Sequence, residues 1–120
     1  MNRLETVRAF VLAEISDDFE EPEHVYENVA EISRTCGLSV DRAEVLGLLH
    51  ELVELGLAKA YLLSPRDPVI EVKAPLLRDR MSELYFWITE DGVRALSTWR
   101  RDWRMSDEGV LLPDCLPPSV

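Results

Sequence analysis

The stretch DRAEVLGLLHELVELGL, residues 41–57, decides the fold of this 120-residue chain. Asp41, followed three residues later by Glu44, has the spacing of a capping box, which often starts a helix. The apolar residues after it cover about half of the helix circumference, which predicts a deeply embedded helix. Gly56 predicts the end of the helix, with Leu57 folding back onto its apolar face. That face consists of Val45, Leu46, Leu48, Leu49, Leu52, Val53 and Leu55.

Two further helices are predicted before this stretch. Asn2 and Glu5 have capping-box spacing and predict the start of the first helix. Pro22 suits the first turn of the second helix, and Gly37 predicts its end. Each helix carries apolar residues at helical spacing, so each is expected to bury one face. These residues are Leu4, Val7, Phe10, Val11 and Ile15 in the first helix, and Val25, Val29, Ile32 and Cys36 in the second.

The residues after position 57 predict a change to short strands and a last helix. A weakly alternating segment, 57–63, and the aromatic segment LYFWI, 84–88, read as strands, with a short strand at 69–72 in the connection between them. Thr89 is expected to cap the last helix, with Val93, Leu96, Trp99 and Trp103 on one side. We expect residues 105–120 to form an extended, proline-rich tail, because proline does not continue a helix.

Two segments resemble bacterial winged-helix transcriptional regulators of the PadR-like and MarR-like type. VLGLLHELVELGLAKAYLL, 45–63, is similar to their third helix and first wing strand. YFWITEDGVRALSTW, 85–99, is similar to the run that leads from their second wing strand into the last helix, with Tyr85, Ile88, Thr89, Gly92, Ala95 and Leu96 in the matching places. The resemblance covers roughly residues 4–104.

This resemblance implies a mainly α fold with a small antiparallel β wing. The expected architecture is a winged helix-turn-helix, in the order helix, helix, helix, strand, loop, strand, helix. One domain is expected over residues 1–104, followed by the tail at 105–120. Fold alone does not determine function, so the surface residues must be considered separately.

The predicted third helix departs from the DNA-reading pattern of those regulators. Its outward positions are expected to be Ala43, Gly47, His50 and Glu54, flanked by Glu44 and Glu51. Residues 1–60 hold thirteen acids against five Lys/Arg, a formal charge of −8, whereas residues 61–120 hold ten against eight, or −2. Phosphate binding depends on Lys and Arg, so the half with the predicted helix-turn-helix is unsuited to DNA. The DNA-reading residues of the family therefore cannot be assigned here.

Two functions remain open from the sequence. In the first, the chain is a regulator that binds double-stranded DNA as a homodimer, with positive charge supplied by the wing and the last helix. Its candidate DNA contacts are Arg66, Lys73, Arg78 and Arg80 in the wing connection, and Arg42 at the start of the third helix. In the second, the chain is a protein-interaction or assembly module that does not bind DNA. Its candidate face is Ala43, Gly47, His50, Glu51 and Glu54, where two small residues four apart admit another helix.

The segment STWRRDWR, 97–104, has two interpretations as well. Trp99 and Trp103 are four residues apart and are expected to share a helix face. They either close the core of the domain against the first helix or form a homodimer interface, in which Arg100 stacks on an indole ring.

Other classes of function find little support in the sequence. His24 and His50 are the only histidines, neither lies in a nucleophile motif, and no glycine-rich phosphate loop occurs, so we expect no enzyme and no cofactor. The eight acids of 14–31 match no metal-binding loop that we can justify, and no metal is expected. Cys36 and Cys115 form no C-x-x-C pair and are expected to be free thiols. Without a long apolar run or a signal peptide, a cytoplasmic protein with no membrane contact is expected.

Overall fold

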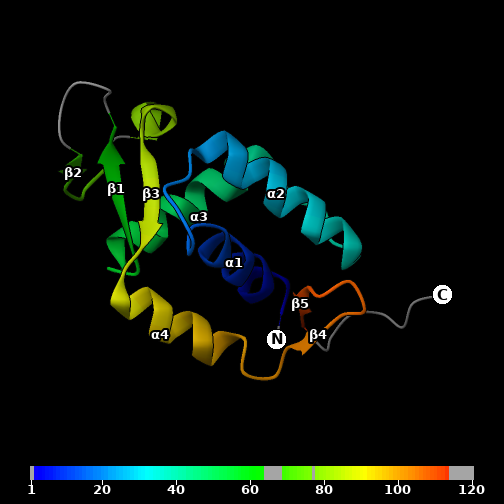
Figure 1. Ribbon diagram of the computed structural model, residues 1–120. Coiled ribbons are helices and arrows are strands. Elements are labelled where there is room, and N and C mark those ends of the chain that lie inside the picture. Colours follow the sequence, from blue (N-terminus) through cyan, green and yellow to red (C-terminus); the bar gives the residue numbers. More distant parts are fainter. Residues whose placement is uncertain (1, 64–68, 77, 114–120) are drawn as a thin grey trace.

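The computed structural model describes residues 2–63, 69–76 and 78–113, with the backbone alone at Arg78. It is mainly helical with a small antiparallel three-stranded sheet (Figure 1). The elements follow the predicted order, with three helices before the first two strands. They are α1 (Arg3–Glu14), α2 (Pro22–Thr35), α3 (Arg42–Glu54), β1 (Ala58–Leu62), β2 (Ile70–Val72), the 3-10 helix η1 (Arg78–Glu83), β3 (Tyr85–Ile88), α4 (Glu90–Trp99), β4 (Arg104–Met105) and β5 (Leu111–Leu112).

The predicted helix ends are confirmed by their hydrogen bonds. Asn2 forms a capping box with Glu5, and the Thr89 hydroxyl accepts from the backbone N–H of Gly92. At the end of α3, Gly56 adopts φ 77°, which glycine tolerates, and its N–H donates to the Val53 carbonyl. The N–H of Leu57 donates to the Leu52 carbonyl at 2.9 Å, which completes a Schellman motif as predicted.

The start of α3 differs from the predicted capping box in one respect. The Asp41 side chain accepts from the backbone N–H of Glu44 at 2.8 Å, as expected. The Glu44 carboxylate does not return to the backbone of Asp41. It forms an ion pair with Arg3 of α1 instead, with N···O distances of 2.5 and 2.7 Å. This pair ties the N-terminal ends of α1 and α3 together.

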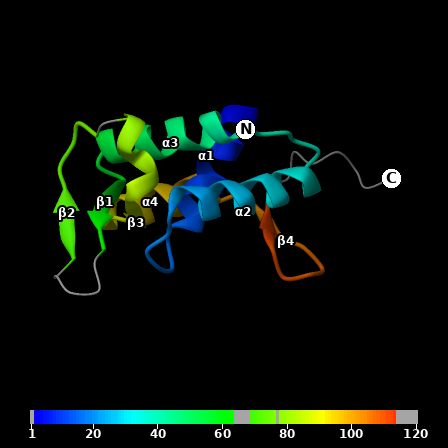
Figure 2. The same ribbon diagram turned by 90° about the horizontal axis from the view of Figure 1, so that it is seen from above.

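Helix α1 lies at the centre of the core, with α2, α3 and α4 packed around it (Figures 1 and 2). Six of its twelve residues are buried, and they do not form a single stripe, because the helix is covered on several sides. The prediction that Leu4 belongs to the buried face is wrong, since it is 47% exposed. It lies in the first turn of α1, on a side of that turn that the packed helices leave open, whereas Arg3 in the same turn contacts α3. The fully buried large residues of the core include Val7, Leu12, Ile15, Val25, Val29, Val45, Leu49, Leu52 and Phe86.

The three strands form an antiparallel sheet in the order β2-β1-β3. Ala60 is the central residue, paired with Val72 on one side and Phe86 on the other. Beyond β3, the connection between α1 and α2 adds an isolated bridge, in which Glu20 and Phe86 exchange two backbone hydrogen bonds of 2.9 and 3.1 Å. The connection therefore covers the edge of β3, whereas in the described part of the chain β2 has no neighbour on its outer side.

Helix α4 packs closely on the turn between α3 and β1. The Thr89 hydroxyl donates to the Gly56 carbonyl at 2.8 Å, and the Thr89 N–H donates to the Leu57 carbonyl at 3.0 Å. A Cβ atom at Gly92 would overlap the Leu57 carbonyl oxygen and lie 2.6 Å from a carbon of Ile88. Only glycine fits at this position without a shift of the backbone.

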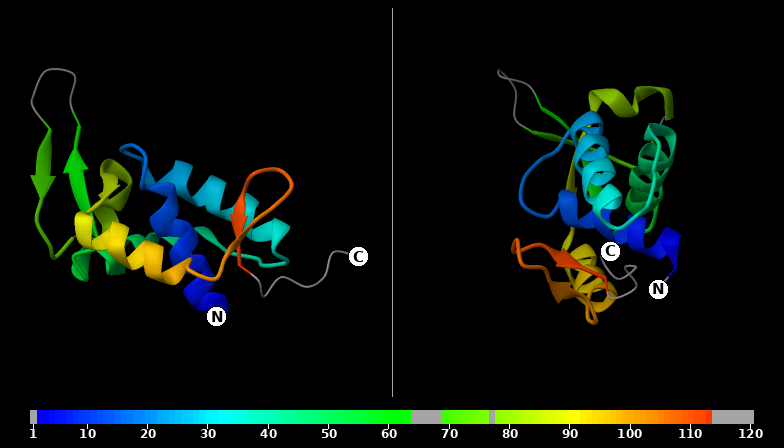
Figure 3. Two further views of the ribbon diagram at one scale, coloured as in Figure 1. Left: turned by 60° about the horizontal axis from the view of Figure 1, so that its bottom comes forward. Right: turned by 90° about the vertical axis from the view of Figure 1, so that its right-hand side faces the viewer.

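The C-terminal segment differs from the predicted extended tail. β4 and β5 form a short antiparallel hairpin, which turns at Gly109 with φ 81°. The left panel of Figure 3 shows this hairpin at the opposite end of the molecule from the β1–β2 hairpin. Leu111 and Leu112 pack against the core, so this part of the segment belongs to the folded unit. Positions 114–120, including Cys115, lie outside the described residues, and Cys36 is buried.

In the parts of the chain that the structure describes, no helix has both the length and the apolar character needed to span a membrane.

Candidate functional site

The candidate DNA contacts that the structure describes are each engaged with a carboxylate. Lys73 lies 2.8 Å from the Glu71 carboxylate, and Arg80 lies at the same distance from Glu83. Arg42 of α3 contacts a carboxylate of α2 at 2.6 Å. These contacts raise the pKa of Lys73 and of Arg80, since each neighbouring carboxylate accepts a hydrogen bond from the cation. The cations keep their charge but are locally neutralised.

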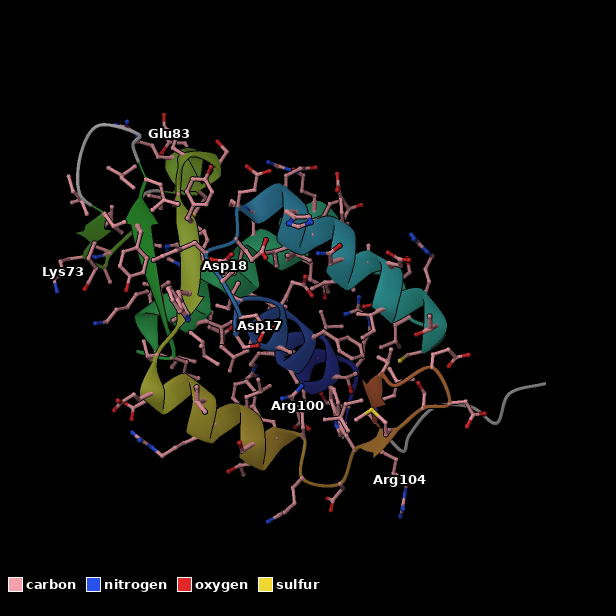
Figure 4. All side chains as sticks on the ribbon, in the orientation of Figure 1. Asp17, Asp18, Lys73, Glu83, Arg100 and Arg104 are labelled. Atoms are coloured by element: carbon pink, nitrogen blue, oxygen red, sulfur yellow. The ribbon has the colours of Figure 1, made fainter. Side chains whose placement is uncertain are left out.

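The side chains of the other two candidate DNA contacts, Arg66 and Arg78, are not described. Arg66 lies outside the described residues, and of Arg78 only the backbone, at the start of η1, is described. Figure 4 shows Lys73 and Glu83 at separate places around the sheet. Arg42 begins α3, Lys73 follows β2 and Arg80 lies in η1, so the described candidates come from three separate elements and each is paired with a carboxylate.

The outer face of α3 is open but lacks one of its predicted members. Ala43 and Glu54 are exposed, and Gly47 and Glu51 are partly exposed, as expected. A Cβ atom at Gly47 would have no atom within 4 Å, so the surface above this residue is free in the described structure.

The prediction that His50 points outward is wrong. Its side chain is buried, with 8% of the residue exposed, because the connection after β2 folds over α3 at this point. The ring atom Nε2 lies 3.1 Å from the Leu76 carbonyl oxygen, and Nδ1 lies 3.3 Å from the Glu54 carboxylate. His50 therefore joins α3 to this connection and is not part of an interaction face.

The tryptophans after α4 are occupied within the chain. α4 ends at Trp99, so the prediction that Trp99 and Trp103 share one helix face is wrong. Trp103 is 8% exposed and packs edge-on against Phe10 of α1, with ring centroids 5.3 Å apart. The Arg8 guanidinium lies over the Trp99 ring, 5.6 Å from its centroid. This arrangement matches the interpretation in which the tryptophans close the core against the first helix.

Arg100, the third member of the predicted dimer interface, lies between the end of α4 and α1 (Figure 4). Its Nε atom is buried without a hydrogen-bond partner among the described residues. The side chain is thus partly enclosed by its own chain. A homodimer remains a prediction, and these three residues offer it little exposed surface.

Sequence reasoning missed an aromatic cluster on the outer face of the sheet. Phe19, from the connection between α1 and α2, packs edge-on against Trp87 of β3 and Tyr61 of β1, with centroid distances of 4.4 and 5.0 Å. Tyr85 lies directly opposite Tyr61 in the register of the two strands. All four side chains are partly exposed. The alternation of LYFWI could have indicated that Tyr85 and Trp87 share a face, because successive side chains of a strand point to opposite sides.

Two exposed carboxylates precede Phe19 in this connection. Asp17 and Asp18 have no cation partner among the residues that the structure describes, and Asp18 accepts a hydrogen bond from the Phe19 N–H at 2.7 Å. Figure 4 shows both in the connection that runs beside β3. The aromatic cluster of Phe19, Tyr61, Trp87 and Tyr85, together with Asp17 and Asp18, forms a surface that we name the aromatic–acidic face. Lys59 lies opposite Trp87 in the register and so shares this side of the sheet, but its ammonium group is paired with Glu71 at 3.4 Å. The rings and the two aspartates can therefore still attract a further cation.

The electrostatic environment of Glu14 reflects the same concentration of acids. Partial burial raises the pKa of the Glu14 carboxyl, and the nearby carboxylates of Glu20 and Asp17 raise it further. The Asn28 amide opposes this by donating a hydrogen bond at 2.5 Å. Glu20 in turn accepts from His24 at 2.7 Å, which raises the pKa of that imidazole.

We expect Glu14→Gln to stabilise the protein at neutral pH. A carboxyl with a raised pKa binds its proton more tightly in the folded state, so stability falls as pH rises above the ordinary Glu value of about 4.3. Glutamine removes the charge and keeps an acceptor for Asn28. The free energy of unfolding in urea should rise by less than ~1 kcal/mol at neutral pH, and the difference should vanish in acid. Glu27→Gln, at an exposed position of α2, is the control. A less stable Glu14→Gln protein at neutral pH would contradict this account.

Metal binding finds no site in the described ranges. No group of three or more His, Cys, Asp or Glu side chains lies in an arrangement that could hold a metal ion there.

Comparisons of the chain with protein-family models, with curated proteins and with solved structures return no match.

Proposed function

We propose that this chain is a winged-helix module that binds a protein partner through the aromatic–acidic face of its sheet. The partner supplies a segment that carries arginine or lysine. The order of the elements supports the winged-helix assignment, because three helices precede a β-hairpin, a third strand and a last helix. β1 and β3 then take the places of the two wing strands, with β2 and η1 in the connection between them.

The observation that carries the proposal is the combination of partly exposed aromatic rings with unpaired carboxylates. Phe19 holds the rings of Tyr61 and Trp87 in a fixed cluster, so little side-chain freedom is lost on binding. A guanidinium placed over such a ring gains about 0.5–1 kcal/mol at an exposed site. Asp17 and Asp18, two exposed carboxylates directly before Phe19 in the chain, add negative charge to this region.

The charge of the chain supports a protein partner over DNA. The net formal charge is −10, and the candidate cations Lys73, Arg80 and Arg42 each contact a carboxylate. DNA affinity comes mainly from the neutralisation of phosphates by free cations. An ion pair must be broken before any of these three can serve that purpose.

Fluorescence anisotropy with two labelled probes tests the proposal. One probe is a peptide of alternating arginine and glycine, and the other is random-sequence duplex DNA, each measured at low and at near-physiological salt. We expect the peptide to bind and the DNA not to bind. The variants Trp87→Ala and Asp17→Asn/Asp18→Asn should each weaken peptide binding, by about two- to fivefold for the loss of the indole.

A matched control separates this surface from the general acidity of the chain. Glu27→Gln/Glu31→Gln removes the same charge from exposed positions of α2 and should leave peptide affinity unchanged. Circular dichroism verifies that each variant is folded. Equal weakening by both double variants would mean that the peptide senses net charge alone, and the proposed surface would be rejected.

A DNA-binding regulator is the second candidate, and the same element order favours it. Such a protein would bind random duplex DNA in a salt-sensitive manner, because the non-specific part of binding is electrostatic. Binding of the DNA probe at low salt, lost at near-physiological salt, would therefore favour the regulator and overturn the proposal above.

A further inference from the structure

The outer edge of β2 has a defined hydrogen-bonding direction, which follows from the Glu20–Phe86 bridge. In an antiparallel sheet, the N–H and C=O of one residue point to the same side, and successive residues alternate. Phe86 directs both groups to Glu20, so its neighbours in β3 direct theirs to β1. Tyr61 therefore bonds to β3, and Ala60 and Leu62 bond to β2.

The same alternation determines which backbone N–H and C=O groups of β2 point to the open edge of the sheet. Val72 pairs with Ala60 and Ile70 pairs with Leu62, so these two residues bond inward to β1. Glu71 between them directs its N–H and C=O to the open edge, and Lys73, two residues later, is assigned to that edge as well. In the described part of the chain no strand occupies this edge.

The charges on this edge are self-complementary. Glu71 and Lys73 lie on one face of the sheet, with their charged groups 2.8 Å apart, and Lys59 of β1 lies 3.4 Å from the same carboxylate. Charges on an edge strand usually prevent pairing, because like charges meet when two copies approach. Here Glu71 and Lys73 carry opposite charges two residues apart. A second β2 strand that runs antiparallel can therefore place a residue of opposite charge across from each of them.

We propose that β2 pairs with β2 of a second copy about a two-fold axis at Val72. In this register Glu71 lies opposite the partner's Lys73, and Lys73 lies opposite the partner's Glu71. In both Glu71 and Lys73 the backbone N–H and C=O point to the open edge. Each Glu71–Lys73 pair across the two-fold axis can therefore exchange two backbone hydrogen bonds, as in an antiparallel ladder. Ile70, which is 52% exposed, then lies opposite the partner's Ala74 and loses contact with water.

The neighbouring registers are less favourable. An axis at Glu71 places two glutamates directly opposite each other, which is destabilising. An axis at Ile70 places Glu71 opposite the partner's Val69 and leaves its charge without an opposite in the partner. The register at Val72 is the one in which both charged residues of the edge find complementary partners.

Charge reversal tests this interface with an internal rescue. Glu71→Lys places lysine opposite the partner's Lys73, and Lys73→Glu places glutamate opposite the partner's Glu71. Each single variant should weaken the dimer about tenfold or more, since two symmetric pairs change from attraction to repulsion. The double variant Glu71→Lys/Lys73→Glu should restore it. An equimolar mixture of the two single variants should form a heterodimer, because both of its cross-strand pairs are then opposite in charge.

Sedimentation equilibrium over a concentration series measures these states, and native mass spectrometry identifies the heterodimer. Glu27→Lys, a reversal at an exposed position of α2, is the control and should leave the dimer unchanged. A wild-type chain that stays monomeric at the highest concentration would overturn the proposal. A dimer that ignores the reversals would overturn it too, and would place the contact elsewhere. Neither outcome depends on whether the aromatic–acidic face binds a peptide.

Discussion

Replacement of Gly92 by alanine is expected to lower the free energy of unfolding by about 3 kcal/mol or more. The added methyl group would overlap the Leu57 carbonyl oxygen and crowd the Ile88 side chain. A backbone oxygen cannot rotate away, so α4 would have to move from the turn between α3 and β1. Urea unfolding monitored by circular dichroism measures the loss.

Gly47→Ala is the matched control for this prediction. Both glycines lie inside helices, but a Cβ atom at Gly47 has no neighbour within 4 Å. Alanine should therefore stabilise the protein there by about 0.5–1 kcal/mol, because glycine loses more backbone freedom on folding. Opposite signs at the two positions would assign the effect at Gly92 to close packing. A neutral Gly92→Ala would mean that α4 does not hold the position described.

Trp103→Ala is expected to have the second large effect, a loss of about 3–5 kcal/mol. The indole is buried against Phe10 of α1 and lies at the junction between α4 and the β4–β5 hairpin. Its removal leaves a cavity at the point where the C-terminal segment joins the core. Chemical denaturation gives the size of the effect.

Trp99→Ala provides the comparison within the same segment. Trp99 is only partly buried and contacts Arg8 through its ring face. Trp99→Ala should therefore lower the free energy of unfolding by less than Trp103→Ala does. If Trp99→Ala proved the more damaging of the two, the assignment of Trp103 to the core would be wrong. Sedimentation of both folded variants would also show whether either residue affects self-association.

Features that depend on neighbouring residues in the chain were predictable from the sequence. The caps at Asn2 and Thr89 and the glycine turn at Gly56 each follow from a few adjacent residues, and the structure confirms them. The strand at 84–88 is likewise local, because aromatic and β-branched side chains favour strands.

Features that depend on distant segments were not predictable in this way. His50 is buried because the connection after β2 covers it, and a helical wheel contains no information about that connection. Leu4 is exposed although Arg3 in the same turn contacts α3, so which side of this turn is covered depends on how distant helices pack. Phe19 stands in an acidic connection, and its place on the sheet follows from the bridge at Glu20.

The C-terminal hairpin is an intermediate case. The prolines at 113, 117 and 118 predict that the segment is not helical, and its described part, up to residue 113, contains no helix. The hairpin that turns at Gly109 was not predicted. The turn residues Ser106 and Asp107, followed shortly by Gly109, could have indicated a turn before the apolar residues at 110–112. The docking of Leu112 onto the core could not be inferred, because it depends on core residues that are distant in the sequence.

The bridge between Glu20 and Phe86 also limits the size of any assembly built through the sheet. Because the α1–α2 connection occupies the edge of β3, each chain offers this sheet a single open edge within its described residues. Two chains that join β2 to β2 produce one continuous sheet whose outer edges are both covered. A third chain then finds no strand to extend, so association by this route closes at two copies and does not propagate into a fibre.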